Sequence, residues 1–285
     1  GTEERDAEFK FVDAVDGLNT AKKNAAAYWY ADATLKLNTK DAYKAREAYY
    51  ELQNIGRFYN EYKDVDDLMK QARDLGTNHA VFQVKNMSNS SLNYDVTKAM
   101  NEITIYNSTG TWYMIHSSYP AGSTDYYIQL NIRKVEAYPE KVTTNRYEES
   151  KEIIDGYEFV YDNQGNIVKD SLGNPIKEPD YKTVTAFITE TWQEKVATVS
   201  GEVVYMDKAG NVLKSIPVRS DAVFQNYYAV ATGYAEALTP QSKAKIGGKP
   251  LPFPYDDQMM IDAMHLLEQQ VRTVTNDYND EYLNL

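Results

Sequence analysis

The sequence predicts an α+β fold in which N-terminal helical hairpins are followed by a mostly antiparallel β-sheet body and a C-terminal amphipathic helix. Over residues 4–76, apolar residues recur every three or four positions, which is typical of helices. From residue 79 they alternate with polar residues, as in strands with one buried face. The helical period returns after residue 256. We therefore divide the chain into a helical subdomain, residues 1–78, and an α+β domain, residues 79–285.

Two segments of the helical part carry clear apolar stripes. Residues 42–52 form the first, and Thr39 precedes them as the expected N-cap. Residues 65–75 form the second, which ends at Gly76, where a left-handed backbone closes a helix at little cost. Alanines alternate with tyrosines along these segments. This pattern loosely resembles the helical hairpins of tetratricopeptide repeats.

The β-sheet body contains several expected strands. In the clearest of them, Ile128, Leu130 and Ile132 point to one face. The expected strands are residues 79–85, 111–117, 126–138 and 183–190, and residues 195–206 extend the last of these. A final amphipathic helix would cover one face of the sheet with a single apolar stripe. That stripe consists of Met260, Ala263, Met264, Leu267, Val271 and Val274.

A five-residue pattern, D-x-x-G-N, occurs at residues 162–166, 170–174 and 207–211. We interpret each copy as a hairpin turn, because Asp can accept hydrogen bonds from its own backbone and Gly can take a positive φ. The alternative is a calcium loop. That alternative needs oxygen ligands at alternating positions and a bidentate acid further along, and these segments lack that spacing. We therefore expect no metal site here.

The composition argues against several classes of partner and site. The net charge is −12, with 42 acidic residues against 30 basic ones, so we expect neither nucleic acid nor an anionic membrane surface as a partner. The chain has no cysteine, which excludes disulfides, zinc thiolates and cysteine nucleophiles. No nucleophile, phosphate-loop or metalloprotease motif occurs. The histidines His79, His116 and His265 are isolated from one another in the sequence, so we assign them structural or surface roles.

Aromatic residues are the best candidates for ligand binding. The chain has 25 tyrosines against 8 phenylalanines. Tyr28, Trp29 and Tyr30 are consecutive, so a helix cannot turn all three inward. With Tyr59 and Tyr62 they form the candidate ligand-binding set. Three interpretations of this aromatic front stay open, namely packing against the β body, a surface for a partner protein, and a sugar platform.

Five segments of the chain carry a resemblance to a known family: residues 29–39 (WYADATLKLNT), 62–66 (YKDVD), 155–162 (DGYEFVYD), 170–177 (DSLGNPIK) and 251–254 (LPFP). In these segments the chain resembles a family of uncharacterised outer-membrane lipoproteins from Bacteroides-type bacteria. The resemblance implies an exported chain that is cut before a lipidated cysteine and tethered to the outer membrane, on its periplasmic or cell-surface side. Gly1, which stands where an initiator Met would be, is consistent with such processing. The family has no known catalytic residues to transfer.

We therefore expect a non-enzymatic protein-interaction or accessory module of the cell envelope, with another envelope protein as its partner. Two alternatives remain. The aromatic residues would also suit a glycan-binding surface protein, and the many carboxylates would allow a hydrolase that uses a pair of them. We expect no cofactor, and contact with a membrane only through the lipid anchor.

Overall fold

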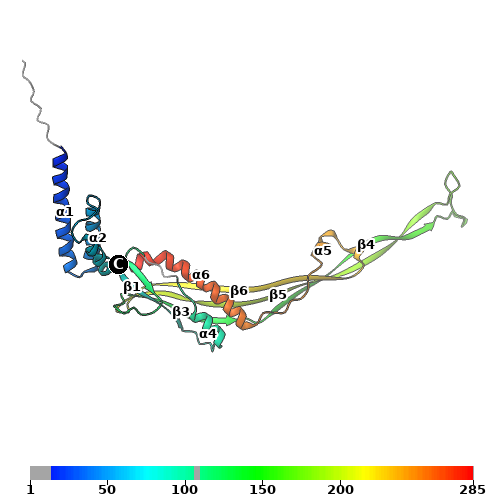
Figure 1. Ribbon diagram of the computed structural model, residues 1–285. Coiled ribbons are helices and arrows are strands. Elements are labelled where there is room, and N and C mark those ends of the chain that lie inside the picture. Colours follow the sequence, from blue (N-terminus) through cyan, green and yellow to red (C-terminus); the bar gives the residue numbers. More distant parts are fainter. Residues whose placement is uncertain (1–13, 106–109, 285) are drawn as a thin grey trace, which may run out of the picture.

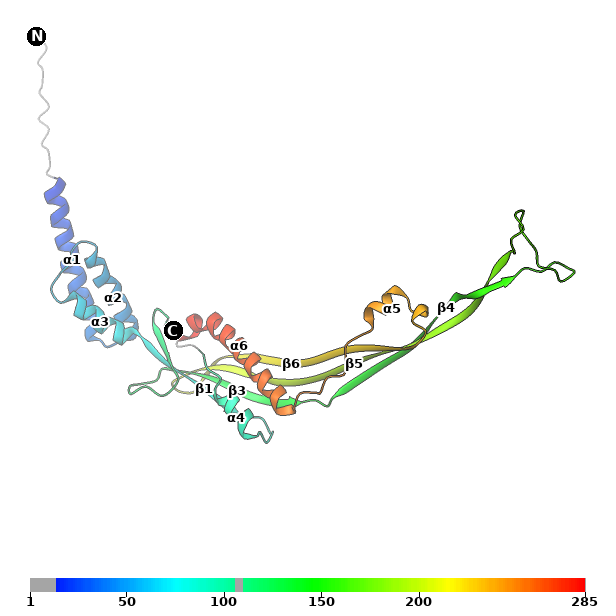
Figure 2. The ribbon, with the colours of Figure 1, turned by 45° about the vertical axis from the view of Figure 1, so that its right-hand side comes forward.

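The computed structural model describes residues 14–105 and 110–284, which form a long crescent (Figure 1). A helical unit lies at one end, a six-stranded sheet covered by a helix lies in the middle, and a narrow β arm forms the other end (Figures 1 and 2). The predicted α+β class is confirmed, because helices precede a mostly antiparallel sheet and α6 (Asp256–Leu283) closes the chain.

Three helices form the helical unit: α1 (Ala14–Asn38), α2 (Ala42–Gly56) and α3 (Val65–Gly76). They share a core in which small residues let the helices approach closely. Its buried members are Ala26, Ala33, Leu37, Ala45, Ala48, Leu52, Ile55, Val65 and Ala72. Residues 4–13 of the predicted helical region lie outside the described residues.

The predicted N-cap of α2 is wrong by two residues. The cap is Asp41, whose side chain accepts a hydrogen bond from the Lys44 backbone N–H, whereas the Thr39 hydroxyl donates to the Lys36 carbonyl at the end of α1. Asp at an N-cap satisfies one of the unpaired N–H groups of the first turn. α3 does end at Gly76, but the left-handed backbone predicted there is wrong, because Gly76 is the last helical residue and has no positive φ, and Thr77 is the C-cap.

The sheet contains β1 (Asn78–Asn86), β2 (Tyr113–His116), β3 (Tyr126–Ala137), β4 (Lys141–Phe159), β5 (Lys177–Asp207) and β6 (Val212–Gly233). Its order is β2-β1-β3-β5-β4, and β6 pairs with the other edge of β5. β1 runs parallel to β2 and β3, and the other pairs are antiparallel. Because β3 pairs with residues 197–207 of β5 and β4 with residues 177–194, the two strands follow each other along one edge.

The segments expected at 183–190 and 195–206 form one continuous strand, β5, and its buried face changes along its length. In its outer half Val184, Ala186 and Ile188 are buried, with η1 (Ala235–Ala237) against them. In its inner half the residues of the opposite face are buried under α6, namely Ala197, Val199, Val203 and Tyr205. Since side chains alternate along a strand, these two sets lie on opposite sides of the sheet.

The chain reaches both faces by passing around the edge of β6. After α5 (Pro240–Lys245), Gly247 forms an antiparallel bridge with Ala229 of β6. The following extended segment then lies on the α6 side, where the Lys195 ammonium donates to the Pro254 carbonyl (2.6 Å). α4 (Tyr94–Asn101) packs against α6 on the same side (Figure 2).

Candidate functional site

Four of the five predicted binding residues come together at the α2–α3 turn. The Trp29 ring stacks on Phe58, with ring centroids 5.9 Å apart and planes 10° apart. Tyr30 meets Tyr62 edge-on at 6.0 Å, and Tyr59 lies 5.4 Å from Tyr62. The fifth, Tyr28, is 67% exposed and makes no ring contact within the described part of the chain.

Two of these rings line a surface pocket of about 530 Å³, which we call the α2–α3 pocket. Tyr59 and Tyr62 form part of its wall. Its other lining residues combine an apolar floor with polar groups, and they are Gln53, Ile55, Gly56, Asn60, Glu61, Lys63, Val65, Asp66 and Met69. Aromatic faces beside amide and carboxylate groups can hold an amphipathic ligand, with ring stacking for its apolar face and hydrogen bonds for its polar edge.

Lys63, which lines the α2–α3 pocket, packs on the ring of Tyr30. Lys63 has φ +49°, a conformation that non-glycine residues rarely adopt, and its ammonium lies 3.8 Å from the centre of the Tyr30 ring. The Tyr30 hydroxyl donates to the Asp64 carboxylate (2.6 Å), and this hydrogen bond raises the pKa of Tyr30. The tyrosine therefore stays a neutral donor at physiological pH.

Other aromatic residues join the helical unit to the sheet. Tyr49 and Tyr50 of α2 contact Trp112 edge-on, with centroids at 5.3 and 5.8 Å, and the Trp112 indole N–H donates to the Tyr50 hydroxyl. Tyr49 and Tyr50, which lie outside the candidate ligand-binding set, therefore pack on the β body. The rings of the predicted set pack within the helical unit, where α1 meets the α2–α3 turn.

The prediction that the histidines are isolated is wrong for two of them. His79 Nδ1 lies 2.9 Å from His116 Nε2, because β1 and β2 are parallel neighbours and bring the two positions together. Burial, and then the neighbouring His79, lower the pKa of His116. A single N–H···N bond needs at least one neutral ring, so the pair fastens β2 to β1 when it carries no more than one charge. Within the described residues no group of three or more potential metal ligands occurs.

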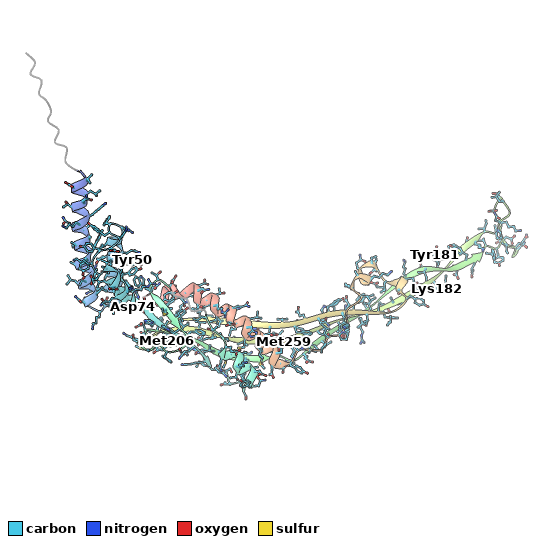
Figure 3. All side chains as sticks on the ribbon, in the orientation of Figure 1. Tyr50, Asp74, Tyr181, Lys182, Met206 and Met259 are labelled. Atoms are coloured by element: carbon cyan, nitrogen blue, oxygen red, sulfur yellow. The ribbon has the colours of Figure 1, made fainter. Side chains whose placement is uncertain are left out.

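The arm ends in a second candidate site, which we call the tip (residues 151–182). It lies beyond the end of β6, so β4 and β5 continue there as a two-stranded ribbon. Figure 3 shows Tyr181 and Lys182 on this part of the arm, far from Tyr50 in the helical unit. The sequence analysis did not predict β4 or β6. β4 has no buried residue and therefore no apolar alternation, and the alternate buried positions of β6, Val218, Ser220 and Ala222, carry small or polar side chains that give only a weak apolar pattern.

Two hairpin turns and the ribbon meet at the tip in a three-way junction. The Val160 N–H donates to the Ile176 carbonyl (3.0 Å), the Ile176 N–H to the Val168 carbonyl (2.9 Å), and the Val168 N–H to the Val160 carbonyl (2.8 Å). This closed ring of backbone hydrogen bonds fixes the bases of turns 162–166 and 170–174. The turns themselves are held as the sequence predicts, with Asp as acceptor and Gly at positive φ.

The tip exposes eight large apolar side chains. They are Ile154, Tyr157, Phe159, Tyr161, Ile167, Leu172, Ile176 and Tyr181. Leu172 is the extreme case, since it is 85% exposed at the apex of its turn. The equivalent positions in the other two turns are Gln164 and Ala209, so the turn itself does not require an apolar side chain.

Comparison with known proteins leaves the family open. No protein-family model matches the chain, and no curated protein sequence matches it. In the described part of the chain, no helix combines the length and the apolar character needed to cross a membrane.

Proposed function

We propose that this protein is a non-enzymatic interaction module of the cell envelope, which presents the tip of its arm to a partner protein. The observation that carries the proposal is the exposed apolar surface of the tip, at the end of the crescent opposite the helical unit (Figure 1). Contiguous exposed apolar surface marks sites of association. The resemblance to exported, outer-membrane-tethered lipoproteins supports another envelope protein as the partner.

The energetics favour association through the tip. Burying an exposed leucine side chain stabilises a complex by about 1.5–3 kcal/mol. Leu172 has no core to enter in its own chain, because the ribbon beneath it is two strands wide. Both hairpin turns are stiffened by their Asp side chains and by the three-way junction, so little conformational freedom is lost on binding.

The charge of the tip indicates the chemistry of the partner. Residues 151–182 contain seven carboxylates and four lysines, which is a net charge of −3. An anionic membrane surface would repel it. A protein pocket with an apolar floor and a basic rim would complement both the leucine and the carboxylates around it.

A variant that lacks residues 160–176, the outer part of the tip with both turns and Leu172, tests the proposal, and we call it the tip-less variant. Phe159 and Lys177 are paired directly, so a two-residue Asn-Gly turn can join them in place of residues 160–176. We expect reproducible partners of the full chain, purified from solubilised envelopes, to be lost with the tip-less variant and reduced with Leu172→Gln. Gln164→Ala is the matched control at the sister turn. Retention of the same partners by the tip-less variant would refute the proposal.

The α2–α3 pocket favours a second candidate function, glycan binding. It places Tyr59 and Tyr62 beside the amides of Gln53 and Asn60, a combination suited to a sugar ring. On a glycan array, we expect any binding to be lost in Tyr62→Ala and kept in Tyr28→Ala, because Tyr28 lies outside the cluster. If the protein binds no glycan on the array, glycan binding is excluded as its function.

A further inference from the structure

One sheet edge of the body is left open beside a pocket. β2 pairs with β1 only from Asn78 to Val81, although β1 continues to Asn86. The other edge of β1 pairs with β3 along residues 80–86. The stretch from Phe82 to Asn86 therefore has a partner strand on one side only, within the described part of the chain.

The backbone groups of the open stretch point outward at alternate residues. The Asn78 N–H donates to the Trp112 carbonyl on the β2 side, whereas the His79 carbonyl accepts from Asp125 on the β3 side. Because backbone groups alternate direction along a strand, even-numbered residues face the open edge. Val84 thus directs both its N–H and its carbonyl away from β3, toward the open edge. Met87, an odd-numbered residue, donates its N–H to the Ile132 carbonyl of β3, which agrees with this alternation.

A pocket of about 430 Å³ lies along this edge. Residues 82–85 form one wall, and the end of α4 with the following residues, 101–104, forms the other, with Ser117 at the end of β2. The second wall is fixed to α6, since the Thr104 N–H donates to the Glu268 carboxylate and the Thr104 carbonyl accepts from Arg272. The space beside the strand is therefore a fixed feature of the fold.

We infer that this edge accepts an extended segment of a partner protein as an added strand, in the place where β2 stops. Addition of a strand to an exposed sheet edge is a general mode of peptide recognition. Exposed edges that must stay unpaired usually carry charge or proline. Here the open stretch from Phe82 to Asn86 lacks proline, and Lys85 near its end is its one charged residue.

The two faces of the edge define the chemistry of the segment. Phe82, Val84 and the buried Ile103 belong to the apolar side of the sheet, under α4 and α6. Gln83 and the exposed Lys85 belong to the opposite side, where the Gln83 amide donates to the Tyr119 hydroxyl (2.9 Å). The added strand should alternate apolar residues toward Ile103 with acidic residues toward Lys85.

Synthetic peptides test the inference. The probe is a fluorescent eight-residue peptide that alternates valine and glutamate, and the comparison peptides are a scrambled version and one that alternates valine and lysine. We expect the valine–glutamate peptide to bind best and to slow amide exchange at residues 82–86. The tip-less variant should bind it as the full chain does, which separates this site from the proposed function of the tip.

Two variants decide the outcome. Val84→Pro removes an outward N–H that the β1–β3 ladder does not use, so the fold should persist while the affinity falls about tenfold. Lys85→Glu should invert the preference between the glutamate and lysine peptides, a readout that a general loss of folding would not produce. Equal binding by Val84→Pro, no binding by any peptide, or exchange protection elsewhere would overturn the inference.

Discussion

At the scale of single residues, the three D-x-x-G-N turns show how a few side-chain and backbone groups specify a local structure. In each copy one Asp oxygen accepts two backbone N–H groups, as Asp207 does from Ala209 and Asn211 (both 2.9 Å). The other oxygen accepts from the Asn side-chain amide. The glycines have φ of +81° to +85°, where another residue would be strained. The same turn therefore serves twice at the tip and once between β5 and β6.

These hydrogen bonds lower the pKa of all three turn aspartates, but their main causes differ. For Asp207 the Asn211 side chain has the largest effect on the pKa, whereas for Asp162 the Asn166 backbone N–H does. We expect Asn211→Ala to raise the pKa of Asp207 more than Asn166→Ala raises that of Asp162. NMR titration of the carboxylates measures both shifts in the full chain, and equal shifts would contradict this ranking.

The sign of the pH dependence follows from the direction of these shifts. A carboxyl group with a lowered pKa in the folded state stabilises the turn fully above its unfolded pKa of about 3.9. That contribution is lost as the pH falls through the lower, folded pKa. The turns should therefore keep their geometry through neutral and mildly acidic pH and loosen only in strong acid.

At the scale of elements, Gly201 controls how closely β3 and β5 approach. A Cβ atom added at Gly201 would lie 2.0 Å from the Asn131 carbonyl oxygen, so no side chain fits without a backbone shift. The register of β3 also shifts next to this pair, between Ile132 and Lys134. Glycine within a strand often marks such a close approach of two backbones.

We expect Gly201→Ala to destabilise the sheet by about 1–3 kcal/mol, the usual cost of forcing extra atoms into a packed site. Chemical denaturation followed by circular dichroism measures the change. Gly122→Ala is the matched control, because a Cβ there meets no atom within 4 Å and the free energy of unfolding should change little. Equal stability of the two variants would show that β3 can move aside freely.

At the scale of the whole molecule, Arg46 joins three parts of the crescent. It is buried in α2, and its Nε donates to the Gly76 carbonyl at the end of α3 (2.8 Å). Its Nη1 donates to the Asn284 carbonyl just after α6 (2.6 Å), and the guanidinium lies 5.8 Å from the Trp112 ring centre. One side chain thus connects the helical unit to the sheet.

We expect Arg46→Ala to destabilise the protein by about 2–4 kcal/mol, because it removes two charge-assisted hydrogen bonds and leaves carbonyl groups unpaired. The helical unit should then unfold less cooperatively with the sheet. Amide exchange would then speed up in α1, α2 and α3 more than in β5 and α6. Arg46→Lys should have an intermediate effect, because a single ammonium does not reproduce the guanidinium fork. A uniform change across the chain would argue against this role.

Local signals in the sequence determined the α+β class, the helix end at Gly76, the three Asp–Gly–Asn turns and the buried alternation at Ile128, Leu130 and Ile132. Each of these features depends on residues within one turn or one strand, so the apolar periodicity and the chemistry of the turn residues are sufficient to predict it. Only the tertiary structure decided that β5 buries opposite faces in its two halves. It also brought His79 to His116, placed Trp29 on Phe58 rather than on the sheet, and left Leu172 exposed. These features depend on which distant segments pair, and the apolar periodicity of a single segment carries no information about that choice.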